Sequence, residues 1–152
     1  MGDAKEYDFL TGRDATLDCR LVTTSGGSEL QLFGNRAGIL SLSNILLWFG
    51  ANAYRREFLA LGELPFVRLD GRLSVSIRLN DGIHKDGHGI IRKLDQGESL
   101  EWEVTEEALK QVALWLHHLA CVPEHEYDRF LVAKSSACGV HVRMTDAAEW
   151  IR

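Results

Sequence analysis

The fold is decided at residues 34–47, which read GNRAGILSLSNILL. Apolar residues in this stretch and just after it recur at spacings of three and four, as on one face of a helix. They are Ile39, Leu42, Ile45, Leu46 and Phe49. Asn35 suits the N-cap, because its side-chain oxygen can accept from the free amides of the first turn. The pattern predicts a largely buried helix over residues 36–61, with a break near Gly50 as the alternative.

Alternating apolar and polar residues outside this helix predict β-strands. Three hairpins are expected, which pair residues 16–24 with 28–33, 66–69 with 73–79, and 89–94 with 100–104. Each is joined by turn residues, at 25–27, 70–72 and 95–97. Two further strands are expected at 130–133 and 140–144, before a short helix at 146–151.

A second helix is expected to begin after Thr105 as its cap, with Glu106 and Glu107 in its positive first turn, and to end by Pro123. Its predicted inward residues are Leu109, Val112, Ala113, Leu116, Leu119 and Ala120. Hairpins with two separate helices indicate an α+β fold: an antiparallel or mixed sheet of hairpins with two main helices packed on one face. We expect a single domain over residues 1–152, with residues 1–14 as a candidate flexible segment.

The composition is that of an ordinary globular protein, with 45% hydrophobic and 26% charged residues in a chain of 152. Its formal net charge of −5 argues against general nucleic-acid binding, which needs Lys and Arg to displace counterions. Cys19, Cys121 and Cys138 are odd in number and scattered, which favours the reducing cytoplasm. The polar N-terminus shows no secretory signal, and the longest apolar run is too short to cross a membrane.

Histidines and cysteines provide only weak signals for catalysis or metal binding. Three pairs are close in sequence: His84 with His88, His117 with Cys121, and Cys138 with His141. Zinc needs three or four converging ligands, and the chain contains neither a C-x-x-C nor an H-E-x-x-H motif. A thiol and a histidine three residues apart in a strand point to opposite faces of the sheet. We therefore expect no catalytic residue, no metal and no cofactor. The alternatives are a small metal- or ligand-binding enzyme that uses these side chains, or a structural subunit of a larger assembly.

Negative charge is concentrated in one segment of the chain. Residues 95–128 carry −8, because nine acids are opposed by Lys110 alone, whereas residues 1–94 carry +1 and residues 129–152 carry +2. Such a segment can be a merely solvated surface, or it can steer a basic partner. The residues expected to bind a partner are Glu101, Trp102, Glu103, Glu106, Glu107, Glu124, Glu126 and Asp128. Trp102 is the candidate apolar anchor of this surface.

Residues 34–47 resemble the strand-to-helix segment of the immunity protein 32 family, small cytosolic bacterial proteins that neutralise toxins of polymorphic and contact-dependent systems. The family pattern is G-N-R-x-G-L-x-S-L-A-N-x-L-L, and here Ile39 replaces the leucine and Ser43 the alanine. Residues 66–70 and 73–77 are also similar to the family's second strand pair. The resemblance spans roughly residues 15–80, about half of the chain.

This resemblance implies a non-enzymatic cytoplasmic protein that binds a cognate toxin domain and blocks its active site. A basic nuclease is a suitable toxin, since a carboxylate-rich face can occupy a cleft that grips phosphate. No direct contact with nucleic acid or membrane is expected, and the oligomeric state is left open. The motif residues Gly34, Asn35, Gly38 and Asn44 are expected to have structural roles, with Asn44 finding a polar partner if it is buried.

Overall fold

The computed structural model describes residues 3–24, 27–52, 58–80, 90–94, 99–121, 128–132 and 138–144. In chain order its elements are η1 (Asp3–Leu10), β1 (Leu17–Thr24), β2 (Gly27–Gly34), α1 (Arg36–Ala51), β3 (Phe58–Ala60), η3 (Leu61–Glu63), β4 (Val67–Leu69), β5 (Ser74–Leu79), β6 (Ile90–Leu94), β7 (Ser99–Val104), α2 (Glu106–Cys121), β8 (Asp128–Val132) and β9 (Cys138–Met144). The two η elements are 3-10 helices.

The described strands form two mixed sheets. The five-stranded sheet has the order β4-β1-β2-β9-β8, and the four-stranded sheet has the order β3-β5-β7-β6. Within the first, β1 pairs antiparallel with β2, and β2 pairs parallel with β9. Within the second, β7 lies between β5, which is parallel to it, and β6, which is antiparallel. The predicted α+β class is confirmed, and the sheets are mixed.

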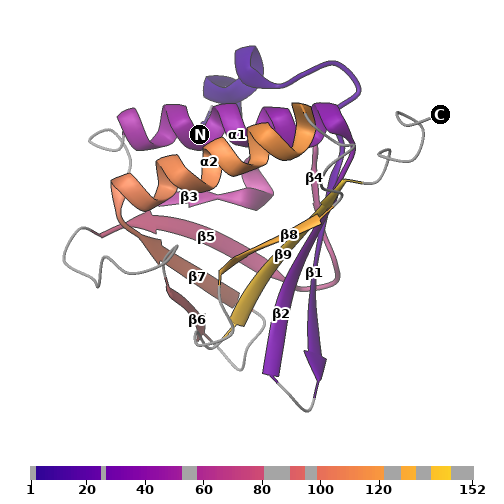
Figure 1. Cartoon of the computed structure of the whole chain (residues 1–152), viewed down its shortest axis with the longest axis vertical. Coiled ribbons are helices and arrows are strands. Elements are labelled where there is room, and N and C mark those ends of the chain that lie inside the picture. Colours follow the sequence, from indigo (N-terminus) through magenta and orange to yellow (C-terminus); the bar gives the residue numbers. More distant parts are fainter. Residues whose placement is uncertain are drawn as a thin grey trace.

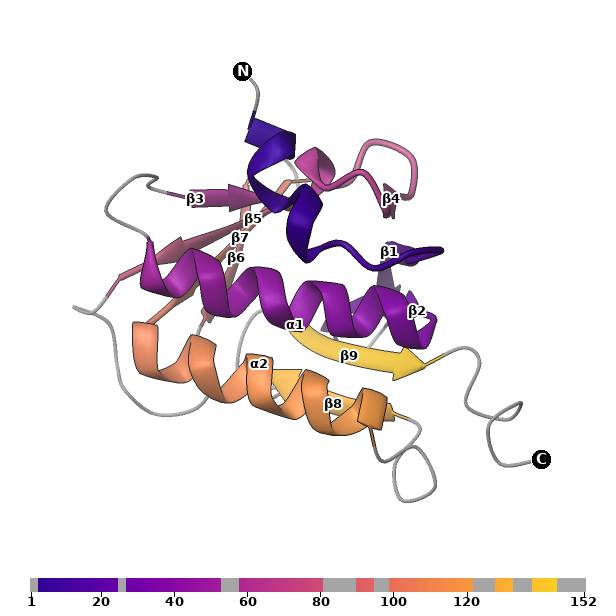
Figure 2. The ribbon, with the colours of Figure 1, turned by 90° about the horizontal axis from the view of Figure 1, so that it is seen from above.

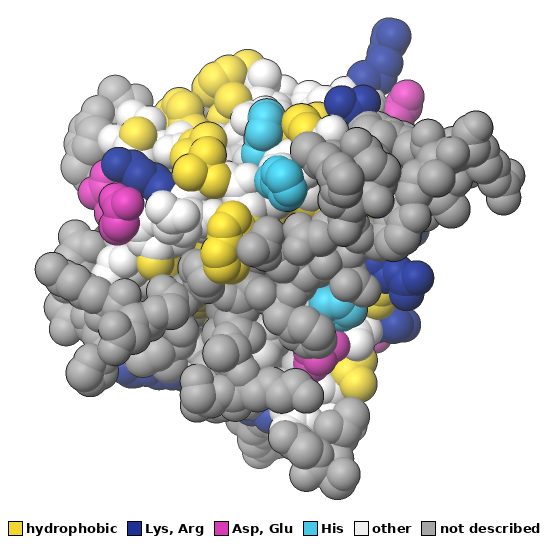
Figure 3. All heavy atoms as spheres, viewed as in Figure 1, with side chains coloured by type: hydrophobic (Ala, Val, Ile, Leu, Met, Phe, Trp, Pro, Cys, Tyr) yellow, Lys and Arg dark blue, Asp and Glu magenta, His cyan; other side chains and the backbone are white. Residues whose placement is uncertain are grey.

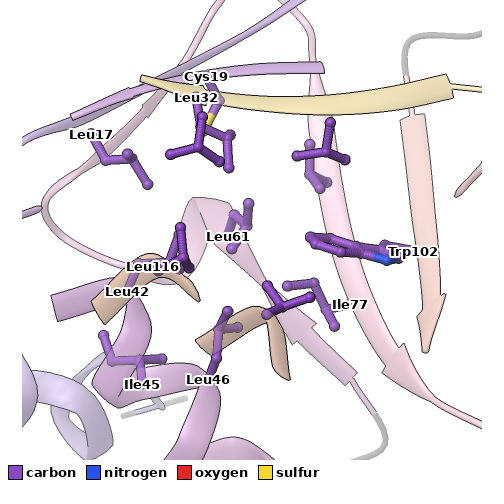
Figure 4. Close-up of a cluster of buried hydrophobic side chains, with 14 of the residues drawn as sticks. Leu17, Cys19, Leu32, Leu42, Ile45, Leu46, Leu61, Ile77, Trp102 and Leu116 are labelled. Carbon is purple, nitrogen blue, oxygen red and sulfur yellow. The ribbon is translucent and has the colours of Figure 1, made fainter. Parts of the chain in front are cut away.

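Helices α1 and α2 lie side by side over the sheets (Figures 1 and 2). All of the inward residues that the sequence predicted for α2 are buried, as are those of α1. Their side chains point toward apolar residues of both sheets, among them Leu17 and Leu32 from one sheet and Ile77 and Trp102 from the other (Figure 4). Both sheets and both helices thus contribute to the same hydrophobic core.

Three of the motif residues, Gly34, Asn35 and Gly38, lie at the junction between β1, β2 and α1. Asn35 caps α1, because its Oδ1 accepts from the amide of Gly38 at 2.8 Å and from that of Thr16 at 3.1 Å. Its Nδ2 donates to the carbonyl of Asp14 at 2.7 Å. A Cβ on Gly38 would lie 2.0 Å from the carbonyl oxygen of Thr16, so only glycine permits this close approach of the helix to the chain before β1.

Two serines, and not Asn44, supply the buried polar groups of α1. Asn44 was expected to need a polar partner only if buried, and it is exposed. Ser43 is buried and donates to the carbonyl of Ala113 in α2 at 2.7 Å. Ser41 donates to Ala37 at 2.6 Å and accepts from the amide of Gly12 at 2.7 Å, which ties the N-terminal segment to α1.

The N-terminal segment packs on the outer side of α1. Tyr7, in η1, is fully buried, and its ring meets that of Trp48 edge-on with centroids 5.6 Å apart. The rings of Phe9 and Trp48 are also T-shaped to each other, with centroids 6.3 Å apart, yet Phe9 remains 69% exposed. No helix in the described part of the chain has the length and apolar character needed to cross a bilayer.

The first helix is shorter than predicted. It ends at Ala51 and not near residue 61, which agrees with the alternative of a break near Gly50. Asn52 terminates it, because its amide donates to Phe49 and Trp48 and its Nδ2 donates to Trp48 at 2.9 Å. Residues 58–60, predicted as helix, form β3, in which Leu59 is fully buried opposite Ile77.

The hairpin predicted for residues 66–79 is wrong, although both of its strands exist. Strand β4 pairs parallel with β1, whereas β5 belongs to the other sheet, between β3 and β7. β4 is an edge strand of its sheet and bonds to β1 at both ends, where Leu17 donates to Phe66 and Asp70 donates to Cys19. The turn at Gly71, with φ +58°, therefore passes the chain from one sheet to the other.

The remaining strand predictions agree with the structure within a few residues. The hairpin of β1 with β2 and that of β6 with β7 are confirmed. The two strands expected in the tail are present as β8 and β9, which pair antiparallel with each other. The helix predicted at 146–151 lies outside the described residues.

Candidate partner-binding surface

The acids of β7 lie beside arginines from both neighbouring strands. Glu101 Oε2 is 3.8 Å from Arg78 Nε on β5. Glu103 Oε1 is 3.1 Å from Arg92 Nη1 on β6, and Glu103 Oε2 accepts from Asn80 Nδ2 at 2.7 Å. Since β7 runs between these two strands (Figure 1), the sheet places one positive charge next to each carboxylate.

This arrangement differs from the acidic surface that the charge of residues 95–128 predicted. Glu103 is only 5% exposed, and each of its carboxylate oxygens has a polar partner, as a buried charge requires. Within residues 95–128 of the sequence, Lys110 is the only basic residue among nine acids. Pairing across the sheet adds Arg78 and Arg92, so the face of β7 is mixed in charge rather than acidic.

Trp102 does not reach the surface. It is 2% exposed and points into the core between the sheets and the helices (Figure 4), opposite Ile77 on β5 and Ile91 on β6. An apolar anchor for a partner would have to be accessible at the surface, and Trp102 is not. Its neighbours on β5 and β6 are buried apolar residues, so Trp102 belongs to the hydrophobic core.

Exposed carboxylates are found at the start of α2. Thr105 caps the helix by accepting from the amide of Ala108 at 3.1 Å. Glu106 and Glu107 follow in the first turn, where the helix dipole stabilises negative charge, and both are exposed. Glu106 is 3.8 Å from Lys110 one turn later. Acidic and basic side chains accordingly meet on the side where α2 begins (Figure 3).

The other acids proposed for this surface cannot be placed on it. Glu124 and Glu126 lie outside the described residues, and Asp128 begins β8 without a described side chain. Of the eight residues that the sequence singled out, the structure therefore places two exposed carboxylates at the helix start, one partly exposed carboxylate on β7, and two buried side chains beside it.

A hollow on the outer face of the five-stranded sheet escaped the sequence analysis. It has a volume of about 600 Å³, and its lining includes Asp18, Arg20, Phe33, Arg68 and Asp70. Arg68 Nε donates to Asp18 Oδ1 at 2.9 Å, and the guanidinium of Arg20 lies 4.6 Å from the ring centre of Phe33. These residues come from three strands, so only the strand register reveals that they share one face.

Cys19 lies in the wall of this hollow without the properties of a nucleophile. Burial, assisted by the negative charge of Asp18, raises the pKa of its thiol to about 12. At neutral pH the thiol is therefore protonated, whereas the thiolate is the reactive form. The hollow also contains two carboxylates and two guanidinium groups, so its charge favours neither anionic nor cationic ligands.

The outward side of the second half of α2 presents uncharged side chains. They are Gln111, Leu114, His117, His118 and Cys121, all of them exposed. Hydrophobic and histidine side chains accordingly lie next to each other over the helices (Figure 3). His117 Nε2 and Cys121 Sγ are 3.5 Å apart, as their spacing on one helix face predicted. His84, His88 and His125 lie outside the described residues, as does the side chain of Cys138.

No family model, curated protein or solved structure among those compared with the chain matches it.

Proposed function

We propose that this chain is an immunity-type protein that binds a cognate bacterial toxin domain and blocks its active site. The observation that carries the proposal is the resemblance of residues 15–80 to the immunity protein 32 family. The matched glycines and Asn35 lie together in the junction of β1, β2 and α1, where they have definite structural roles. The residues that carry the resemblance are thus ones that this scaffold requires.

Glu106 and Glu107 are the members of the proposed surface whose side chains the structure shows as exposed. Two carboxylates on the first turn of a helix project negative charge from a rigid element, in a position where the dipole favours that charge. A nuclease that grips phosphate with Lys and Arg would meet a complementary charge there. Glu101, Glu124, Glu126 and Asp128 remain predicted members of the same surface.

Co-expression with the cognate toxin domain tests the class of function. We expect the chain to restore the growth of cells that express the toxin, and to co-purify with the toxin as a stoichiometric complex. A catalytic antidote would protect without forming a stable complex. Unrelieved toxicity with no complex would contradict the proposal.

Neutralising the two exposed acids tests the surface. We expect E106Q/E107Q to slow association with the toxin about three- to tenfold at low salt, and to reduce the dependence of the rate on salt, because the loss is one of electrostatic steering. The matched control is D8N/D70N, which changes the net charge equally at two exposed acids elsewhere. Equal rates for both double variants would exclude the start of α2 from the interface.

A further inference from the structure

The last turn of α2 holds two metal-ligating side chains in a chelating arrangement. His117 and Cys121 are one helical turn apart, both are exposed, and Nε2 lies 3.5 Å from Sγ. The negative end of the helix dipole lies at this turn and favours a bound cation. Imidazole nitrogen and thiolate sulfur together are the donor set that zinc prefers.

The distance between the two donors fits a tetrahedral zinc ion. With Zn–S of about 2.3 Å, Zn–N of about 2.0–2.1 Å and a tetrahedral angle, the sulfur and the nitrogen are about 3.6 Å apart. The observed 3.5 Å separation therefore matches the donor spacing that one tetrahedral ion requires. The side chains are preorganised, so metal binding orders little that is now free.

This pair supplies only half of a structural zinc site. Such sites are almost always four-coordinate, and in the described part of the chain no group of three His, Cys, Asp or Glu side chains converges. The two remaining ligands must come from outside the pair. A second copy of the chain, related by a two-fold axis through the metal, would supply one histidine and one cysteine in the same geometry.

The surroundings of the pair favour a second copy over water as the source of these ligands. Leu114 lies one turn before His117 on α2 and is 53% exposed. Between Gln111 and Cys121 the exposed side chains of α2 carry no formal charge when histidine is neutral. A copy that approaches this face would bury apolar surface and would meet no like-charge repulsion along it.

We propose that His117 and Cys121 form one half of a Cys2His2 site that binds a zinc ion between two copies of this chain. Each cysteine loses its thiol proton to solvent and binds the metal as a thiolate, so each zinc releases two protons. The affinity consequently falls as the pH is lowered, since both the thiol and the imidazole must be deprotonated. This proposal is independent of toxin binding and stands or falls separately from it.

Untagged protein, freed of metal and kept reduced with a phosphine, is titrated with zinc chloride while its molar mass is followed by light scattering. We expect uptake to saturate at one zinc for two chains, with a doubling of the molar mass that a chelator reverses. H117Q and C121S should each weaken zinc binding more than about tenfold. H118Q is the matched control, since it removes a neighbouring exposed imidazole and should bind zinc as before.

Several outcomes would overturn the proposal. One zinc per monomer, zinc binding without a change in mass, or unaltered binding by H117Q would each exclude a shared site. A dimer that persists in H117Q and contains no metal would show that the copies associate without a shared zinc ion. The replaced side chains are exposed, so circular dichroism should show that H117Q and C121S remain folded.

Discussion

At the scale of single residues, two glycines of α1 have opposite environments. A Cβ on Gly38 would meet the backbone oxygen and carbon of Thr16 at 2.0 and 2.8 Å, and neither atom can move without shifting the chain. A Cβ on Gly50 would meet only Leu109 Cδ2, at an ordinary contact distance of 3.6 Å. The same substitution in one helix should therefore change stability in opposite directions.

We expect G38A to lower the free energy of unfolding by about 2–3 kcal/mol, because overpacking here pushes on backbone. We expect G50A to raise it by about 0.5–1 kcal/mol, through the higher helix propensity of alanine. Chemical denaturation of both variants measures the two effects. Equal effects of the two substitutions would show that the close approach of Gly38 to Thr16 does not constrain the fold.

Asn35 makes one contact that the sequence predicts and two that it does not. Its cap is predictable, because the acceptor and the amides that it serves lie within three residues. Its bonds to Asp14 and Thr16 are not, since they join residues about twenty positions apart. The exposure of Asn44 could not be predicted from the sequence either, because it depends on which side of α1 the other elements cover.

At the scale of elements, neighbouring strands decide what the acids of β7 can do. The alternation of residues 100–104 correctly predicted a strand but not the environment of its polar face. Glu103 is paired with Arg92 and bonded to Asn80, and both partners come from other parts of the chain. The pairing of β4 was predicted wrongly for the same reason. The turn at Gly71 can be predicted from the local sequence, but the strand that pairs with β4 cannot.

Two ion pairs between strands should differ in their contribution to stability. The Asp18–Arg68 pair joins β1 to β4 with side chains 52% and 80% exposed, whereas the Glu103 side chain is 6% exposed. We expect D18N to change the free energy of unfolding by less than about 0.5 kcal/mol. We expect E103A to cost about 1–2 kcal/mol, because the half-buried Asn80 loses its hydrogen-bond partner, whereas Arg92 is 57% exposed and can bind water instead.

The variant E103Q separates the charge of Glu103 from its hydrogen bond. The glutamine oxygen can still accept from Asn80, so we expect a loss between those of D18N and E103A, measured by the same denaturation. High salt should narrow the difference between E103Q and the unsubstituted chain, since the Arg92 side of the pair is exposed to solvent and its charge is screened. A loss for E103A as small as that for D18N would contradict the assignment of Glu103 to a structural pair.

At the scale of the whole molecule, the two sheets are joined into one structure. Their apolar faces and both helices share a hydrophobic core, in which Leu32 of β2 and Trp102 of β7 both point inward (Figure 4). Lys93 on β6 donates to the hydroxyl of Ser28 on β2, which links the sheets at their surface. Ser43 joins the two helices above them. From these connections we infer that neither sheet is stable alone.

We therefore expect the chain to unfold in one cooperative transition, and a local defect to weaken both sheets equally. Native-state hydrogen exchange of G38A measures this, because the substitution lies beside β1 while β7 is in the other sheet. If G38A costs about 2 kcal/mol, the slowest amides of β1 and of β7 should both exchange about 30-fold faster. Faster exchange in β1 with unchanged exchange in β7 would divide the molecule into two units. Equal acceleration would mean that the junction at Asn35 and Gly38 stabilises the four-stranded sheet through the shared core, without contacting it.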